Sequence, residues 1–67
     1  MMQVTVNGEN KEFPPETSVS ELLKSFDTDE RYVAVELNRR IVPRAQFSEK
    51  LLMENDILEI VTFVGGG

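Results

Sequence analysis

The residues with the clearest chemical potential are three consecutive glycines, Gly65, Gly66 and Gly67, which close the sequence. Glycine has no β-carbon, so this segment is thin enough to lie extended in a narrow channel of a partner and to deliver an α-carboxylate there. Together with Val64 it would span about 13 to 14 Å, at roughly 3.3 to 3.6 Å per residue. We therefore expect Gly67 to be the reactive residue, with Gly65 and Gly66 as its neck.

The same glycines have a simpler explanation. Chain ends are commonly disordered, and in an arbitrary protein such a tail is more often a frayed end than a functional device. We expect the three glycines to be mobile in either case, because they carry no side chains that could fix them. A reaction at Gly67 also needs an outside catalyst, since a carboxylate is a poor electrophile and no phosphate-binding glycine loop followed by lysine occurs here.

The composition argues against an independent enzyme. The 67 residues include no histidine and no cysteine, which removes the side chain best suited to general base catalysis near neutral pH and the thiolate ligands of zinc. We expect no metal site and no catalytic residue of its own. A chain this short buries only about 60% of the surface that its unfolded form exposes, so one small domain without an enclosed active site is expected.

The charge indicates which partners to expect. Twelve acidic and seven basic residues give a net charge of −5, which opposes binding to nucleic acid or to anionic membranes and favours basic protein partners. Glu59 and other carboxylates near the end of the chain could steer such a partner, although an acidic excess is more often only a solvated surface. No apolar run approaches the roughly 18 to 20 residues of a membrane span. Without cysteines or a signal peptide, we expect a cytoplasmic protein that is monomeric when free.

The first half of the sequence predicts a hairpin and a helix. Alternating apolar residues over 2–6, the turn dipeptide Asn7-Gly8 and a short return strand over 11–13 indicate the hairpin, which the prolines at 14 and 15 end. The motif Ser18-Val19-Ser20-Glu21 fits a capping box at the start of a helix. Apolar residues then recur at helical spacing, which predicts one buried stripe: Val19, Leu22, Leu23 and Phe26.

The second half predicts strands. Residues 32–38 are typical of a buried strand, residues 39–40 of a polar turn, residues 41–42 of a short return strand, and residues 57–64 of a last strand. A single helical turn or an irregular crossover is expected between Arg44 and Asn55. The order predicts an α+β fold in which one main helix packs across a mixed sheet of four to five strands. The domain would cover residues 1–64 and the flexible tail residues 65–67, with Phe63 and Val64 as candidate partner contacts.

These pieces resemble the ThiS family of thiamine-pathway sulfur carriers, which have the ubiquitin-like β-grasp fold. The resemblance spans essentially the whole chain. Its more specific parts are the block Val42-Pro43-Arg44 and the ending from Asn55-Asp56 through the three glycines. The opening strand with Asn7-Gly8, the helix and the block from Val35 to Asn38 match as well. Arg44 belongs to the family pattern and would either brace the last strand or contact a partner.

The resemblance implies a carrier and not an enzyme. A partner adenylyltransferase of the ThiF type would use ATP and magnesium to convert the carboxylate of Gly67 into an acyl-adenylate. Sulfur from a persulfide donor protein would then replace AMP and leave a thiocarboxylate on Gly67. The resemblance implies that thiazole synthase of the ThiG type receives this sulfur.

Three alternatives remain open at this point. A molybdopterin-pathway sulfur carrier is similar in fold and also ends in two glycines, although the short chain and the Val42-Pro43-Arg44 block favour thiamine. A ubiquitin-like protein modifier would join Gly67 to a lysine of a target protein. An interaction domain with an inert tail would bind its partner without Gly66 and Gly67.

Overall fold

The chain begins with the predicted hairpin. In the computed structural model, which describes residues 1–63, β1 (Met2–Val6) and β2 (Glu9–Phe13) pair antiparallel. Asn7 and Gly8 form the turn with φ angles of 50° and 84°, the left-handed geometry that two-residue hairpins require. β2 begins two residues earlier than expected, because so tight a turn already places Glu9 opposite Val6.

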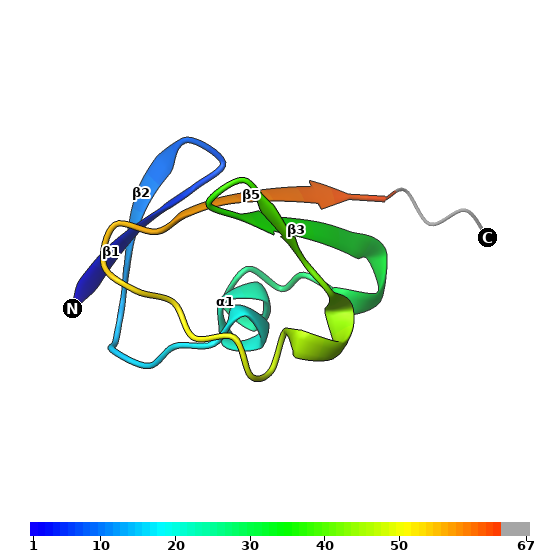
Figure 1. Cartoon of the computed structure of the whole chain (residues 1–67), viewed down its shortest axis with the longest axis horizontal. Coiled ribbons are helices and arrows are strands. Elements are labelled where there is room, and N and C mark those ends of the chain that lie inside the picture. Colours follow the sequence, from blue (N-terminus) through cyan, green and yellow to red (C-terminus); the bar gives the residue numbers. More distant parts are fainter. Residues whose placement is uncertain (64–67) are drawn as a thin grey trace.

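Within residues 1–63, one α-helix covers one face of the sheet (Figure 1). It is α1 (Val19–Ser25), and the predicted capping box is confirmed: the Glu21 amide donates to Ser18 Oγ at 3.1 Å, and the Ser18 amide donates to the Glu21 carboxylate at 2.9 Å. Val19, Leu22 and Leu23 are fully buried. Phe26 follows the helix as its C-cap and is 37% exposed, so the buried stripe ends one turn earlier than the spacing predicts.

Two short 3₁₀ turns and three strands complete the fold. In chain order these are η1 (Glu30–Tyr32), β3 (Val33–Leu37), β4 (Arg40–Val42), η2 (Arg44–Gln46) and β5 (Ile57–Thr62). The single helical turn expected after Arg44 is η2, whereas Tyr32, the last residue of η1, was expected to belong to the following strand. The turn between β3 and β4 lies at Asn38 and Arg39, with φ angles of 52° and 70°, one residue earlier than the expected turn.

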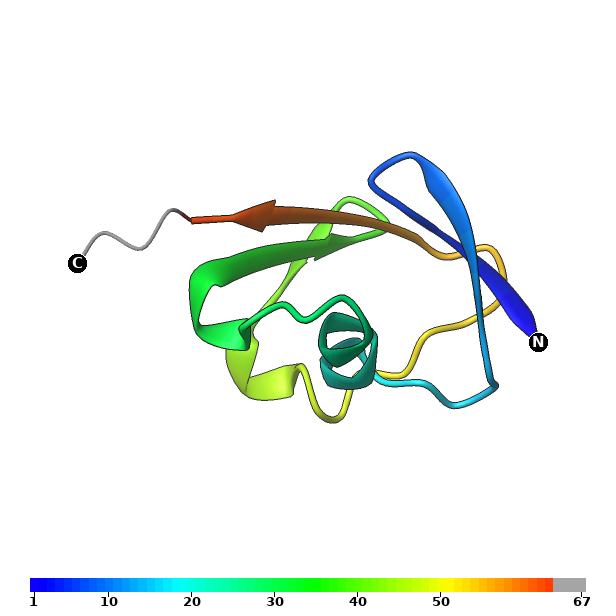
Figure 2. The same cartoon turned by 180° about the vertical axis from the view of Figure 1, so that it is seen from behind.

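The five strands form one mixed sheet in the order β2-β1-β5-β3-β4. β5 lies in the centre, parallel to β1 and antiparallel to β3. Figures 1 and 2 show the helix and the crossover after β4 on one side of this sheet. The α+β prediction, with one main helix packed across a mixed sheet, is therefore confirmed.

The crossover between η2 and β5 closes the core without regular secondary structure. Phe47 and Leu52 are almost fully buried, whereas Leu51 and Met53 are 45% and 67% exposed. Backbone hydrogen bonds tie this segment to the start of the helix, including Ser20 N–H to Phe47 O and Leu52 N–H to Thr17 O, at 2.9 and 2.8 Å. No helix within residues 1–63 is long and apolar enough to cross a membrane.

The two hairpin turns allow a matched test of backbone strain. A Cβ added at Gly8 would meet no atom within 4 Å, so Gly8→Ala should lower the free energy of unfolding by about 1 kcal/mol through the positive φ alone. Arg39 also has a positive φ, so the converse change, Arg39→Gly, should raise the free energy of unfolding by up to about 1 kcal/mol. Urea unfolding of both variants checks this, and an unchanged Gly8→Ala midpoint would contradict it.

Candidate functional site

The candidate site lies at the end of β5, where the chain leaves the sheet. Val64, Gly65, Gly66 and Gly67 lie outside the described residues, and so does the prediction that the three glycines are mobile. The structure does show how the preceding residues are held and which side chains surround them. Three features matter: the clamps along β5, the contacts of Phe63 and the open face of the sheet.

Two asparagines from the two hairpin turns hold β5 from both flanks. Asn7 Oδ1 accepts a hydrogen bond from the Ile60 amide at 2.7 Å, and Asn7 Nδ2 donates to Ile60 O at 3.2 Å. On the other flank, Asn38 Oδ1 accepts from the Ile57 amide at 3.0 Å. The side chain of Asn7 thus extends the parallel pairing of β1 and β5 beyond the last residue of β1. Both clamps fix β5 along its length.

The start of β5 is fixed by a buried carboxylate. Asp56 is 8% exposed, and its two side-chain oxygens accept from Asn38 Nδ2 at 2.9 Å and from the Met53 amide at 2.7 Å. Its carbonyl oxygen also accepts from the Thr5 amide at 2.9 Å. Asp56 therefore joins the crossover, the β3–β4 turn and β1, which is a structural role.

The far end of β5 is held by η1. The Phe63 amide donates to Tyr32 O at 2.7 Å, one residue beyond the end of the strand. Arg44 Nη2 donates to the neighbouring carbonyl, Arg31 O, at 3.0 Å. Arg44 thus braces the turn that anchors Phe63 and does not bond to β5 itself. The expected choice between bracing the last strand and contacting a partner stays open for Arg44.

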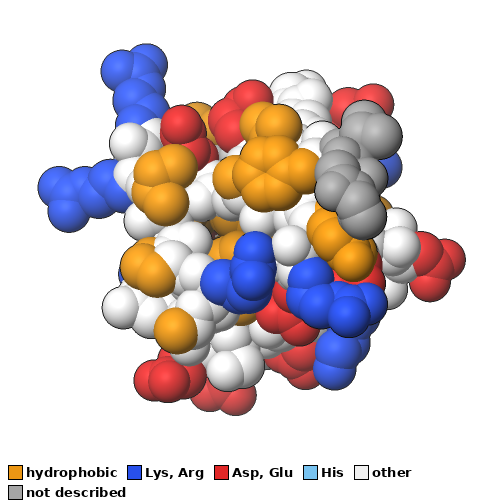
Figure 3. Space-filling view, turned by 90° about the vertical axis from the view of Figure 1, so that its right-hand side faces the viewer, with side chains coloured by type: hydrophobic (Ala, Val, Ile, Leu, Met, Phe, Trp, Pro, Cys, Tyr) orange, Lys and Arg blue, Asp and Glu red, His pale blue; other side chains and the backbone are white. Residues whose placement is uncertain are grey.

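The face of the sheet opposite the helix exposes apolar side chains. Ile41, Ile57 and Val61 alternate outward from β4 and β5 and are 66%, 52% and 58% exposed. Phe63 follows in the same alternation and is 50% exposed. We call Ile41, Ile57, Val61 and Phe63 the outer-face patch. Figure 3 shows the end of the molecule at which β5 stops, where hydrophobic and basic side chains lie side by side.

Two glutamates lie on the same face. Glu59 is exposed on β5, directly opposite Glu36 on β3. Like charges at opposite positions of neighbouring strands repel each other and destabilise a sheet. Their negative charge nevertheless lies beside the outer-face patch, where it would attract a basic surface. The steering role of Glu59 stays a prediction.

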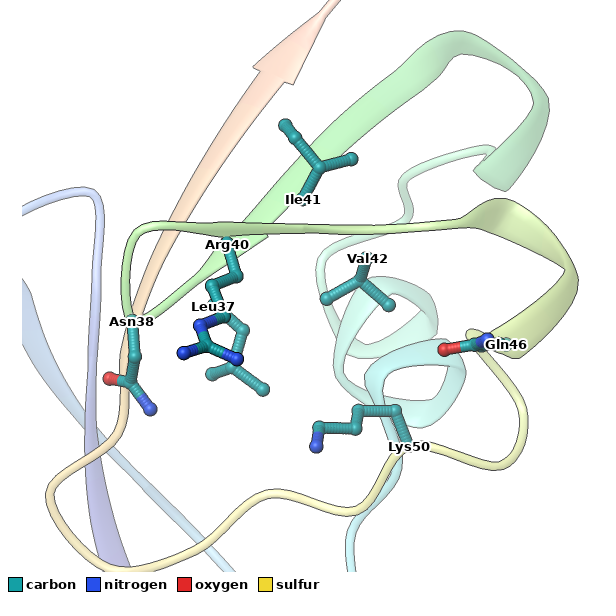
Figure 4. Close-up of a pocket in the computed structure, with 7 residues that line it drawn as sticks. All are labelled: Leu37, Asn38, Arg40, Ile41, Val42, Gln46 and Lys50. Atoms are coloured by element: carbon teal, nitrogen blue, oxygen red, sulfur yellow. The ribbon is translucent and has the colours of Figure 1, made fainter.

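The described residues hold no arrangement typical of an enzyme active site. No group of three or more acidic side chains within residues 1–63 could hold a metal ion. An open pocket beside β4 has Arg40 and Lys50 at its rim and the apolar side chains of Leu37 and Val42 at its floor (Figure 4). No carboxylate and no hydroxyl lines this pocket. Its ionisable side chains are Arg40 and Lys50.

Charged groups also stabilise the turn that anchors Phe63. The Asp29 carboxylate accepts from the Arg31 amide at 2.9 Å and forms an ion pair with Arg31 Nη2 at 2.8 Å. These hydrogen bonds with Arg31 lower the pKa of Asp29 from 3.8 to about 2, and the same pair raises the pKa of Arg31. The Arg31 guanidinium also lies 5.4 Å from the centre of the Tyr32 ring.

Comparison with known proteins shows which family the chain belongs to. The model of the ThiS family matches residues 4–67, so the chain belongs to the ThiS family. The sulfur carrier protein ThiS of Bacillus subtilis is 35% identical over 63 residues, which are 92% of this chain and 96% of that protein. A thiazole synthase of Paramagnetospirillum magneticum is 41% identical over 66 residues, which are 98% of this chain. The chain spans only 20% of the length of that synthase.

The fold has a solved counterpart. The crystal structure of the thiamine biosynthesis protein ThiS from Geobacter metallireducens superposes with a TM-score of 0.82 at 33% identity. The match covers 98% of this chain and all of that one. The expected β-grasp architecture is thereby confirmed.

Several residues that position the site escaped the sequence analysis. Asn7 and Asn38 were assigned only to turns or strand ends, and Tyr32 only to a strand. A sequence does show that asparagine suits a turn with positive φ. It does not show which strand the asparagine side chain contacts, because in both cases that strand lies more than ten residues away.

The ion pair at η1 predicts a titration. The folded chain favours the charged form of Asp29, so its stabilising contribution is fully present above the unfolded pKa of about 3.9. It is lost as the pH falls through the folded pKa of about 2. We expect the Asp29 carboxyl signal and the Arg31 amide signal in NMR spectra to titrate together with a midpoint of about 2. The variant Arg31→Gln should move the Asp29 midpoint upward, and a wild-type midpoint near 3.9 would contradict the assignment.

Proposed function

We propose that this protein is a sulfur carrier of thiamine biosynthesis whose reactive group is the carboxylate of Gly67. The observation that carries the proposal is the match to a sulfur carrier protein over nearly the full length of both chains, 92% and 96%. The three terminal glycines, which the family model includes, supply the slender segment that such chemistry needs. The chain would act as a co-substrate of partner enzymes and not as a catalyst.

The proposed reaction proceeds in three balanced steps. The Gly67 carboxylate attacks the α-phosphorus of ATP, the bond to the bridging oxygen breaks, and pyrophosphate leaves. The terminal sulfur of a protein persulfide then attacks the acyl carbon, AMP leaves with the bonding electron pair, and a proton is released. A thiolate finally attacks the donor cysteine's sulfur in the resulting acyl disulfide. The sulfur–sulfur bond breaks, its electron pair stays on the acyl-bound sulfur as the thiocarboxylate of Gly67, and a new disulfide forms with the donor cysteine.

A partner must supply the catalytic machinery for these steps. Acyl activation requires a nucleotide site, a metal ion and oriented electrophilic groups in a site that excludes water. Within residues 1–63, no group of three or more acidic side chains could hold a metal ion, and the pocket beside β4 is an open surface hollow. We infer that an adenylyltransferase of the ThiF type binds ATP and magnesium and receives the glycines in a channel.

Thiazole synthase is the proposed acceptor of the sulfur. The relative from Paramagnetospirillum magneticum is named a thiazole synthase and contains a segment that matches 98% of this chain. A second thiazole synthase, from Magnetococcus marinus, matches over the same share of this chain at 35% identity. Linkage of the two activities in one polypeptide supports an encounter between this carrier and a separate synthase of the ThiG type.

The outer-face patch is the proposed docking surface for these partners. It includes Val61 and Phe63 on the segment that leads directly to the glycines, so a partner that covers the patch would also receive the tail. Four large apolar side chains at 50% exposure or more are available for burial there. The carboxylates of Glu36 and Glu59 favour a partner with basic side chains beside an apolar centre.

The chemical test is the mass of the chain purified gently from its own cells. Replacement of one carboxylate oxygen by sulfur adds about 16 Da, so accurate mass must separate it from methionine oxidation. We expect the added mass on Gly67 after fragmentation of the C-terminal peptide. The variant Gly66→Ala should fold normally and lose the modification. A C-terminus that stays unmodified with ATP, a persulfide donor and a ThiF-type enzyme would contradict the carrier function, as would an isopeptide bond to a target protein.

The docking surface has its own test. Val61→Ser removes an exposed apolar contact at the centre of the patch and should raise the KM for the carrier in ATP–pyrophosphate exchange about tenfold, which corresponds to about 1.4 kcal/mol. Met53→Ser is the matched control, because Met53 is 67% exposed in the crossover and outside the patch. Equal KM values for the two variants would exclude the patch as the docking surface.

A further inference from the structure

We propose that Arg44 is a positioning residue that sets the direction in which the chain leaves the sheet. The inference rests on the proposed function, because direction matters only if a partner must receive the glycines. Arg44 would act through η1 and Phe63, without contact with the partner. It is a different role from docking, which the outer-face patch serves.

A backbone hydrogen bond just beyond β5 holds Phe63, the last described residue. The pairing of β5 with β3 ends with Thr62 opposite Val33. One further backbone bond follows, from the Phe63 amide to Tyr32 O at 2.7 Å. The position of Phe63 therefore depends on where η1 places the carbonyl group of Tyr32.

η1 is a weak element that needs outside support. It has three residues, none of them buried, so the core does not fix it. Two side chains from other elements do. Ser20 Oγ donates to the Glu30 carboxylate at 2.7 Å at the start of the turn, and Arg44 Nη2 donates to Arg31 O at 3.0 Å one peptide before Tyr32.

Arg44 is well placed for this task. It follows Pro43, whose φ of −61° is fixed by its ring, and it begins η2, so its backbone has little freedom. Its guanidinium reaches thirteen residues back along the chain to Arg31 O. Loss of this bond would free the peptide next to the one whose carbonyl anchors Phe63. Gly67 lies only four residues beyond this anchor, so the position of Phe63 limits where a partner can receive Gly67.

The experiment compares Arg44→Gln with Arg40→Gln, which removes the same charge from β4. The first readout is amide hydrogen exchange of Phe63 in the free protein, which we expect to be about tenfold faster in Arg44→Gln and unchanged in Arg40→Gln. The second is ATP–pyrophosphate exchange by a ThiF-type adenylyltransferase. We expect kcat to fall about tenfold in Arg44→Gln with KM within threefold of the wild type, because docking is intact and the tail is misdirected.

A conservative variant separates geometry from charge. Arg44→Lys retains the positive charge on a shorter stem without the guanidinium fork, so it should behave like Arg44→Gln in both readouts. Wild-type kcat and KM in Arg44→Lys, with a loss in Arg44→Gln, would show that charge alone matters and would overturn the proposal. A raised KM with unchanged kcat in Arg44→Gln would show direct contact with the partner and would overturn it too.

The exchange assay distinguishes failure of the proposed function from failure of the positioning role of Arg44. If the wild type supports no exchange with any ThiF-type enzyme, the proposed function fails and the positioning role falls with it. If the wild type is active and Arg44→Gln changes neither the Phe63 exchange rate nor kcat, only the positioning role is overturned.

Discussion

The pairing of β5 in the centre of the sheet is the constraint on which the rest of the molecule depends. Because β5 joins β1 in parallel and β3 in antiparallel orientation, the chain between β1 and β5 must cross from one end of the sheet to the other. The helix and the crossover form this connection on one side of the sheet, and together with the strands they bury a continuous apolar layer. The opposite face is left open. A covered face that stabilises and an open face that can bind follow from the same topology.

The open face combines properties that a free domain would avoid. Its exposed isoleucine, valine and phenylalanine side chains are available for burial against a partner. The opposed carboxylates of Glu36 and Glu59 repel each other, although Arg39 lies beside them. Both features weaken the isolated domain slightly and favour the bound state. The asparagine clamps on β5 counteract this, because they hold the strand through hydrogen bonds that leave the open face free.

Patterns among neighbouring residues predicted most of the secondary structure. The Asn7-Gly8 turn, the capping box at Ser18 and the alternation along β5 each concern residues within a few positions of one another, and each was predictable. The failures concern contacts between distant residues. The burial of Phe47 and Leu52, the shift of the second turn and the formation of η1 depend on segments that meet only in the folded chain. For the site, alternation indicated that some side chains along 60–63 point outward but not which ones, and the partner of Arg44 lies thirteen residues away and had no local signal.

The central position of β5 also determines how the domain resists force. A partner that draws the residues after Phe63 into a channel pulls along the axis of this strand. The hydrogen bonds to both neighbouring strands run across that axis, so the load falls on many of them at once and cannot open them one by one. At an edge strand pulled sideways, the same bonds would open in succession. In the proposed function, the sheet would thus give mechanically strong support to the segment that partner enzymes bind, modify and release.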